Sequence, residues 1–218
     1  TQLTTILLQN LEGALVPQHD TVPEPIDDEF RNCGGLLEPF DLQLFEPRYL
    51  DMLTRCLKQG SGFGVVGLLA GQEVGAAATH CAELGCEALI RDWEKLPNGL
   101  LGIRVEGGRR FRVGATQVQA DQLLLAEVQW LKSGDDLPLA IEQADLVALL
   151  ATLAEHPLVA GLGLDGTVSG QQSLANQLAY LLPFTLEQKL ALLALPQPTE
   201  QLALIQSLLD RLQGEMLA

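Results

Sequence analysis

Residues 101–113, LGIRVEGGRRFRV, decide the fold class of this chain. Apolar and polar residues alternate on both sides of Gly107-Gly108. The run before the glycine pair is LGIRVE, and the run after the pair is RRFRV. Such alternation is typical of β-strands, because successive side chains point to opposite faces of a sheet. A glycine pair between two alternating runs indicates a turn. The stretch therefore predicts a hairpin of two antiparallel strands.

Further short apolar runs lie before and after this stretch. They predict strands within residues 6–17, 36–45, 62–69, 88–93 and 123–131. One helix is expected among them, from Glu46-Pro47 to Gly60, because proline fits the first helical position and glycine ends a helix. Several strands with one embedded helix favour a mixed or antiparallel sheet that curls into a barrel-like shape.

The pattern changes to helical periodicity after Lys132. Leucine-rich stripes at helical spacing lie within residues 146–153, 174–182, 186–193 and 202–212. Thr185 and Thr199 are placed to cap two of these helices, and Gln188 completes a capping box behind Thr185. We therefore expect an α+β protein with a β-rich subdomain, residues 1–132, and a C-terminal helical bundle, residues 133–218.

The net charge of the chain argues against some classes of partner. The chain has a formal net charge of −15, and residues 133–218 contain 10 acidic and 2 basic side chains. A surface this acidic repels phosphate backbones, so the charge argues against nucleic acid as a partner. No apolar run reaches the roughly 18–20 residues of a membrane span, and the N-terminus lacks the basic region of a signal peptide. We expect a cytoplasmic protein without membrane contact.

Motifs for catalysis or cofactor binding are weak. Residues 62–67, GFGVVG, match GxGxxG, but the expected helix precedes them and the expected strand follows, which reverses the dinucleotide-binding order. Close packing of strands explains these glycines more simply. No GxxxxGK[ST], GxSxG or HExxH sequence occurs. His80, Cys81 and Cys86 suggest a zinc site, but a second ligand pair is absent and free thiols are favoured. We expect no catalytic residue, metal or cofactor.

One basic cluster stands out in this acidic chain: Arg104, Arg109, Arg110 and Arg112. Guanidinium groups could form ion pairs with the carboxylates of a peptide or the phosphates of a nucleic acid. The favoured alternative is that the arginines occupy the solvent face of the hairpin and pair with Glu106 and neighbouring acids. Trp93 and Trp130 are expected to pack in the sheet, although a tryptophan at the edge of a groove would suit a binding anchor.

Several segments together resemble the LON domain, the N-terminal substrate-recruiting domain of Lon proteases. LFEPRYLDM at residues 44–52 resembles the family's FEPRY segment, and it is followed by a helix and by GFGVV at 62–66. IRDWEKLPNG at 90–99 and GGRRFRV at 107–113 resemble two further markers, in the family's order. The likeness covers residues 42–212. The first 41 residues fit less well, and an extra loop is expected at 19–35.

The resemblance implies a PUA-like β-rich subdomain, a helical bundle and a role in binding proteins. We expect a non-catalytic module that binds unfolded or exposed polypeptide segments and lacks the ATPase and Ser–Lys peptidase parts of Lon. The candidate binding residues are Arg48, Tyr49, Trp93, Arg109 and Arg110. An RNA-binding PUA-like protein and a small-molecule enzyme are the alternatives. The identity of the partner and the oligomeric state stay open.

Overall fold

A computed structural model describes residues 2–9, 40–44, 46–70, 80–97, 100–132, 134, 136–160 and 166–216 of the chain. The described residues belong to two compact units. The first contains those from 2 to 132, and the second contains those from 134 to 216. The loop expected at 19–35 and part of the strand expected at 6–17 lie outside the described residues.

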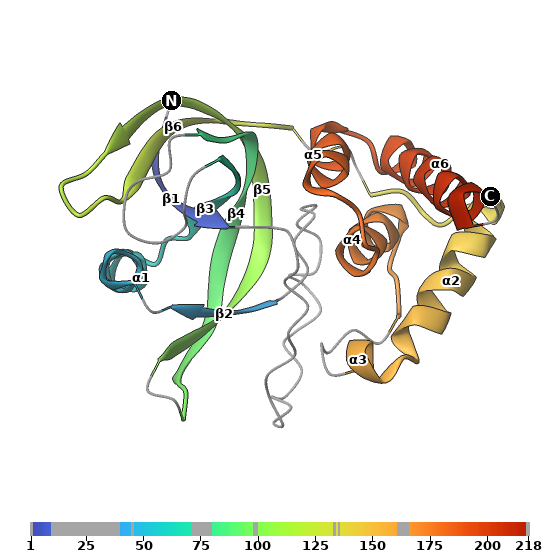
Figure 1. Ribbon diagram of the computed structural model, residues 1–218, viewed down its shortest axis with the longest axis horizontal. Helices are drawn as coiled ribbons and strands as arrows, with labels where there is room; N and C mark the ends of the chain where they lie inside the picture. Colours follow the sequence, from blue (N-terminus) through green and yellow to red (C-terminus); the bar gives the residue numbers. More distant parts are fainter. Residues whose placement is uncertain are drawn as a thin grey trace. The chain divides into compact units, whose positions relative to one another are not determined.

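Four antiparallel strands form the centre of the first unit. They follow one another in the sheet in chain order: β3 (Phe63–Ala70), β4 (His80–Lys95), β5 (Leu101–Val118) and β6 (Leu124–Trp130). In Figure 1 the long strands β4 and β5 run side by side through this unit. Their length, 16 and 18 residues, lets each strand pair with different neighbours along its course.

Two further strands complete this sheet. Strand β1 (Gln2–Gln9) runs parallel to β3 and antiparallel to β6. Strand β2 (Phe40–Leu44) runs antiparallel to β5 and forms an edge. The α+β class expected from the sequence is confirmed, with a mixed sheet to which the term barrel-like applies only loosely.

The glycine pair Gly107-Gly108 does not form a turn. Strand β5 continues through both residues without a reversal, so the predicted hairpin at this point is wrong. The chain reverses only after β5, where Gln122 adopts a left-handed conformation with φ of 69° in the turn that leads to β6. Glycine marks bulges and close approaches in strands as well as turns, and the sequence alone does not separate these cases.

Helix α1 (Pro47–Gln59) confirms the start and the end predicted for it. Gly60 caps the helix with φ of 62°, and its backbone N–H reaches the carbonyls of the last turn. The buried face of α1 packs against the sheet to form one core of the unit: Leu44, Tyr49, Met52, Leu53, Cys56, Phe63, Val65, Ala88, Ile103, Val105 and Leu123.

Two glycines let these strands pack closely. A Cβ at Gly62 would overlap the carbonyl oxygen of Ala88, which supports strand packing as the explanation of the GxGxxG match. A Cβ at Gly85 would lie 2.6 Å from the Phe111 ring, from a Val66 methyl group and from a backbone oxygen. Gly85 therefore makes room for a second core on the other face: Val66, Phe111, Leu124, Ala126 and Val128.

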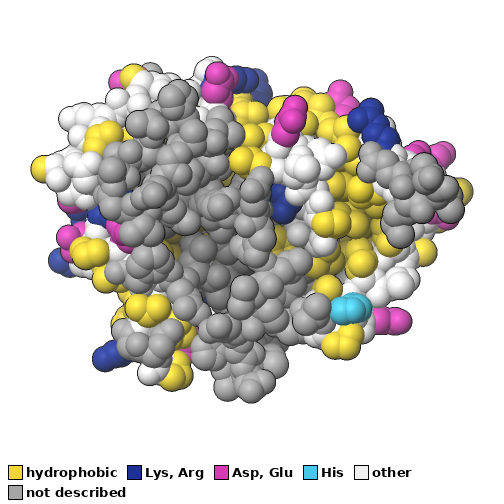
Figure 2. Space-filling view, in the orientation of Figure 1, with side chains coloured by type: hydrophobic (Ala, Val, Ile, Leu, Met, Phe, Trp, Pro, Cys, Tyr) yellow, Lys and Arg dark blue, Asp and Glu magenta, His cyan; other side chains and the backbone are white. Residues whose placement is uncertain are grey.

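The second unit is helical. After a short 3-10 turn (Ile141–Gln143) its helices are α2 (Ala144–Ala154), α3 (Pro157–Ala160), α4 (Gln171–Leu181), α5 (Leu186–Ala194) and α6 (Pro198–Met216). All four predicted helices are present, and the short α3 is added. Leucines from α2, α4, α5 and α6 fill one core. Figure 2 shows further hydrophobic side chains gathered over these helices on the visible face, among scattered acidic ones.

One of the two predicted helix caps is confirmed. Thr185 accepts a hydrogen bond from the Gln188 backbone N–H, and the Gln188 side chain accepts one from the Thr185 N–H, as a capping box requires. Thr199 does not cap α6, because that helix already begins at Pro198. Proline is favourable at the first helical position, where its missing N–H has no partner in the helix.

Candidate functional site

A β-bulge shapes the surface around the arginine cluster. Gly108 and Arg109 of β5 together lie opposite one residue of β4, Glu87, because the register shifts at this point. The flanking residues pair one to one: Ala88 with Gly107, and Cys86 with Arg110. A bulge turns the local strand direction and reorients side chains, so it decides which arginine is exposed.

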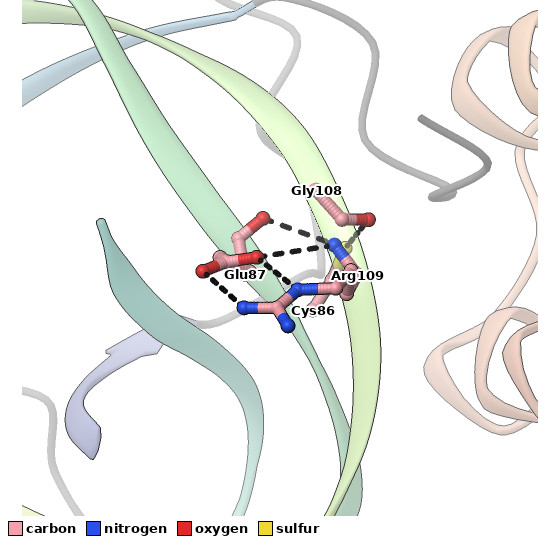
Figure 3. A network of polar contacts seen from close by, with 4 residues as sticks. All are labelled: Cys86, Glu87, Gly108 and Arg109. Atoms are coloured by element: carbon pink, nitrogen blue, oxygen red, sulfur yellow. Dashed lines mark hydrogen bonds and ion pairs between the residues drawn. The ribbon is translucent and has the colours of Figure 1, made fainter. Parts of the chain in front are cut away.

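Glu87 and Arg109 form a close ion pair across this bulge. The Arg109 guanidinium donates from Nε to Glu87 Oε2 at 3.1 Å and from Nη2 to Oε1 at 3.3 Å, as Figure 3 shows. The Arg109 backbone N–H also points to Oε2, at 3.4 Å. A Cβ at Gly108 would come within 3.0 Å of the same carboxylate. The second glycine thus gives the carboxylate space to reach its partner.

Trp130 of β6 supports the same guanidinium from another side. The guanidinium carbon of Arg109 lies 3.8 Å from the centroid of the Trp130 ring, within cation–π range. The Trp130 ring in turn meets the Phe111 ring edge to face, at 5.8 Å between centroids. Arg109 is still 57% exposed. Glu87 and Trp130, which are both partly buried, thus hold the exposed guanidinium of Arg109 in one position.

Arg110, the next residue, lies inside the protein. It is 1% exposed, and its Nη2 donates to the carbonyl of Lys132 at 3.4 Å, where the first unit ends. Burial lowers the pKa of the Arg110 guanidinium below its ordinary value. The prediction that the arginines share the solvent face is therefore wrong for Arg110. Its position suits a role in holding the end of β6 rather than contact with a partner.

Arg48 and Tyr49 of the FEPRY segment are also buried. The Arg48 guanidinium donates from Nη1 to the carbonyl of Gln122 at 3.0 Å, and its Nε lies 3.1 Å from Glu46 Oε2. The guanidinium also lies over the Tyr49 ring, 4.8 Å from its centroid. Arg48 therefore fixes the left-handed turn between β5 and β6 to the start of α1.

Trp93, in contrast to Arg48 and Tyr49, is exposed to solvent. It lies near the end of β4, opposite Ile103 of β5, and is 56% exposed. Its backbone N–H donates to the side chain of Asp92 at 2.7 Å. The prediction that Trp93 packs in the sheet is wrong, whereas Trp130 is half-buried against Phe111. An exposed indole provides apolar area that does not have to be uncovered for binding.

The structure thus divides the five candidate residues. Arg109 and Trp93 are accessible, and Arg48, Tyr49 and Arg110 are buried. Sequence reasoning missed Glu87, because its pairing with Arg109 depends on the strand register. As expected, Arg109 and Arg112 pair with neighbouring acids, Glu87 and Glu83, and Glu106 pairs with Arg91.

Other chemistry is not assembled in the described part of the chain. No group of three or more His, Cys, Asp or Glu side chains there could hold a metal ion. Cys56, Cys81 and Cys86 are free thiols, and burial raises the pKa of Cys56 and Cys81 above its ordinary value. None of the described helices has the length and apolar character that crossing a membrane requires.

Comparison with known structures finds a similar fold in two Lon N-terminal domains. The structure is similar to the Lon N-terminal domain protein from Xanthomonas campestris, with 26% sequence identity, a TM-score of 0.68, and coverage of 95% of this chain and 98% of that one. It is also similar to the N-terminal domain of Mycobacterium avium complex Lon protease, with 18% identity, a TM-score of 0.56, and coverage of 94% and 96%.

No curated protein matches the sequence. A family match, however, covers residues 39–211, which include α1 with its buried arginine, the bulge of β5 and the helices of the second unit as far as residue 211 in α6. The chain therefore belongs to the family of ATP-dependent protease La (LON) substrate-binding domains.

Proposed function

We propose that this protein is a non-catalytic binding module that recognises unfolded or exposed polypeptide segments through Trp93 and the neighbouring surface of the first unit. Membership of the substrate-binding family supports a protein or peptide as partner. The observation that carries the proposal for this chain is the exposure of Trp93. Tryptophan is enriched among the residues that dominate binding energy, because one rigid side chain buries a large area.

The ion pairs on β5 argue against nucleic acid as the partner. Arg109 and Arg112 already contact Glu87 and Glu83, so each cation has an acidic neighbour in place of a phosphate. Affinity for nucleic acid rests on basic side chains that release counterions from phosphates. With a net charge of −15 on the whole chain, a polypeptide is the better candidate.

Peptide titration tests this proposal. A short unstructured peptide rich in Leu and Phe, labelled with fluorescein, should bind the protein in anisotropy measurements and stay intact on incubation with or without ATP. Trp93→Ala should weaken binding about tenfold, since a central aromatic anchor contributes on the order of 1–2 kcal/mol. The matched control is Leu57→Ala, which removes another exposed apolar side chain of the same unit, on α1, and should change binding less than about twofold.

Two results would refute the proposal. The first is a protein that fails to bind any apolar peptide at high concentration. The second is equal loss of binding in Trp93→Ala and Leu57→Ala, which would show that the position of Trp93 has no special role.

A further inference from the structure

A short apolar segment of the second unit is presented to solvent. Residues 137–141, LPLAI, are all exposed, and we call them the 137–141 strip. Ile141 is 91% exposed, and Leu137 and Leu139 are the other large apolar side chains of the strip. Three large aliphatic side chains within five residues are costly to leave in water, so an exposed patch of this kind indicates an interaction surface.

Hydrogen bonds hold the strip in place. The Gln171 backbone N–H donates to the carbonyl of Leu137 at 2.8 Å, and its side chain donates to the carbonyl of Pro138 at 2.9 Å. At the other end the Ala140 N–H donates to the side chain of Gln143 at 2.7 Å. A segment fixed at both ends loses little conformational entropy when a partner binds.

The residue before the strip is also fixed to helix α4. The Asp136 carboxylate accepts a hydrogen bond from the Gln172 N–H at 2.8 Å, at the N-terminal end of α4. Gly170 lies against that carboxylate, and a Cβ there would lie 2.6 Å from both oxygens. The contact between Asp136 and α4 thus sets the direction in which the strip starts.

The negative charge around the strip indicates which kind of partner can bind there. Asp136 precedes the strip, Glu142 and Asp145 follow it, and all three are exposed. Residues 133–218 carry a net charge of −8, from 10 acidic and 2 basic side chains. A second copy would bring the same negative charge to the strip. Residues 10–39 of this chain, with 7 acidic and 1 basic side chain, are also unsuitable. Like charges brought together across an interface are strongly unfavourable.

We infer that the 137–141 strip is a second docking surface, which binds a basic polypeptide segment that carries apolar side chains. The apolar side chains of the partner cover Ile141 and its neighbours, and its Lys or Arg side chains face the three flanking carboxylates. This inference rests on the proposed function and adds to it the charge of the segment that is recognised. It assigns a recognition role to the helical unit, separate from Trp93 in the first unit.

Two peptides of equal length and equal apolar content test the inference, one with Lys and one with Glu at all polar positions. The Lys peptide should bind at least about tenfold more tightly at low salt, and the difference should shrink as salt screens the charges. Ile141→Ser should weaken binding of the Lys peptide by about tenfold, with an unchanged helical circular dichroism spectrum.

Charge variants separate local from general electrostatics. Glu142→Gln with Asp145→Asn should remove most of the preference for the Lys peptide. The matched control, Glu155→Gln with Asp210→Asn, makes the same change in net charge at exposed acids elsewhere in the unit and should retain the preference. Equal effects of the two double variants would overturn the inference, because the attraction would then be non-specific.

The outcomes also distinguish this inference from the proposed function. Suppose that both peptides bind equally, that Trp93→Ala weakens this binding, and that Ile141→Ser leaves it unchanged. This result would overturn the docking surface and leave the proposed function intact. A failure of both peptides to bind would overturn both. Sedimentation that shows a dimer of the parent protein and a monomer of Ile141→Ser would identify a second copy as the occupant and overturn the basic segment.

Discussion

Replacement of Arg48 by Met tests whether the FEPRY segment serves structure or binding. In the parent protein the guanidinium connects three groups: the carbonyl of Gln122, the carboxylate of Glu46 and the ring of Tyr49. Arg48 is 4% exposed and Glu46 13% exposed, so neither charge is well solvated. Methionine fills a similar volume without charge or hydrogen-bond donors.

The expected loss of stability follows from these contacts. Removal of a hydrogen bond from a charged donor costs about 1.5–3 kcal/mol when the acceptor loses its partner. Breaking a buried ion pair on one side costs about 3–5 kcal/mol, and the partial exposure of Glu46 reduces this figure. These terms overlap, because they concern one guanidinium. We therefore expect Arg48→Met to lower the free energy of unfolding of the first unit by about 3 kcal/mol.

Urea unfolding followed by tryptophan fluorescence measures this loss. Both tryptophans, Trp93 and Trp130, belong to the first unit, so their emission reports the unfolding of that unit even if the helical unit unfolds separately. Arg48→Lys keeps the charge and should lose less than Arg48→Met. Arg55→Met, at an exposed position of the same helix, should stay within about 0.5 kcal/mol of the parent.

One result would refute this reasoning. If Arg48→Met retained the parent stability but lost peptide binding, Arg48 would be a binding residue and not a structural one. Loss of stability with parent-like peptide affinity at low urea supports the structural role.

Three further predictions follow from single contacts. Gly85→Ala should lower the free energy of unfolding of the first unit by about 2–3 kcal/mol in the same urea assay, because the new Cβ would lie 2.6 Å from a backbone oxygen and two side chains. A loss below about 1 kcal/mol would show that the strands can separate there. Thr185→Ala should lower the stability measured from the helical circular dichroism signal by about 1 kcal/mol, and Thr185→Ser should stay close to the parent; equal losses would refute the capping role. Burial raises the pKa of Cys56 and Cys81 above 9.0, so these thiols ionise at lower pH in the unfolded chain than in the folded protein. The free energy of unfolding should therefore fall as the pH rises from about 8 to 10, and it should fall less steeply in Cys56→Ala. A flat or rising profile would contradict this.

Elements that depend on local sequence could be predicted well. Helix α1 begins at Pro47 and ends before Gly60, as expected, because the fixed φ of proline and the left-handed conformation of glycine act within one turn of the helix. The capping box at Thr185 is local in the same way, since both of its hydrogen bonds join residues three apart. The stripes of leucine likewise predicted the helices of the second unit, because a buried face repeats along one helix.

Features that depend on a partner strand could not be predicted. Gly107-Gly108 satisfied the pattern of a turn, but the choice between a turn and a bulge is made by strand β4, which is about 20 residues distant in sequence. Thr199 failed as a cap for a different reason, because Pro198 offered an earlier start for α6. The exposure of Trp93 also had no counterpart in the sequence, where an aromatic residue in a strand is more often buried.

The candidate site was predicted in part for the same reason. Arg109 was among the candidate residues, but Glu87 and Trp130 were not connected to it, since they belong to two other strands. Adjacent residues of one strand face opposite sides, and the register alone decides which of Arg109 and Arg110 reaches solvent. A sequence that contains both arginines gives no means to choose between them.

The bulge explains one of the two glycines in residues 107–113, because a Cβ at Gly108 would come within 3.0 Å of the Glu87 carboxylate. Without the extra residue, Arg109 would take the place of Arg110 opposite Cys86, by the alternation of side chains along a strand. Phe111 would then move to the other face, away from the space above Gly85 and from the Trp130 ring. The bulge thus sets the register of the sheet after residue 109, and through it Arg109 is exposed and Arg110 is buried. Residues 107–113 thus encode this register, whereas the surfaces proposed for binding, Trp93 and the 137–141 strip, lie outside this segment.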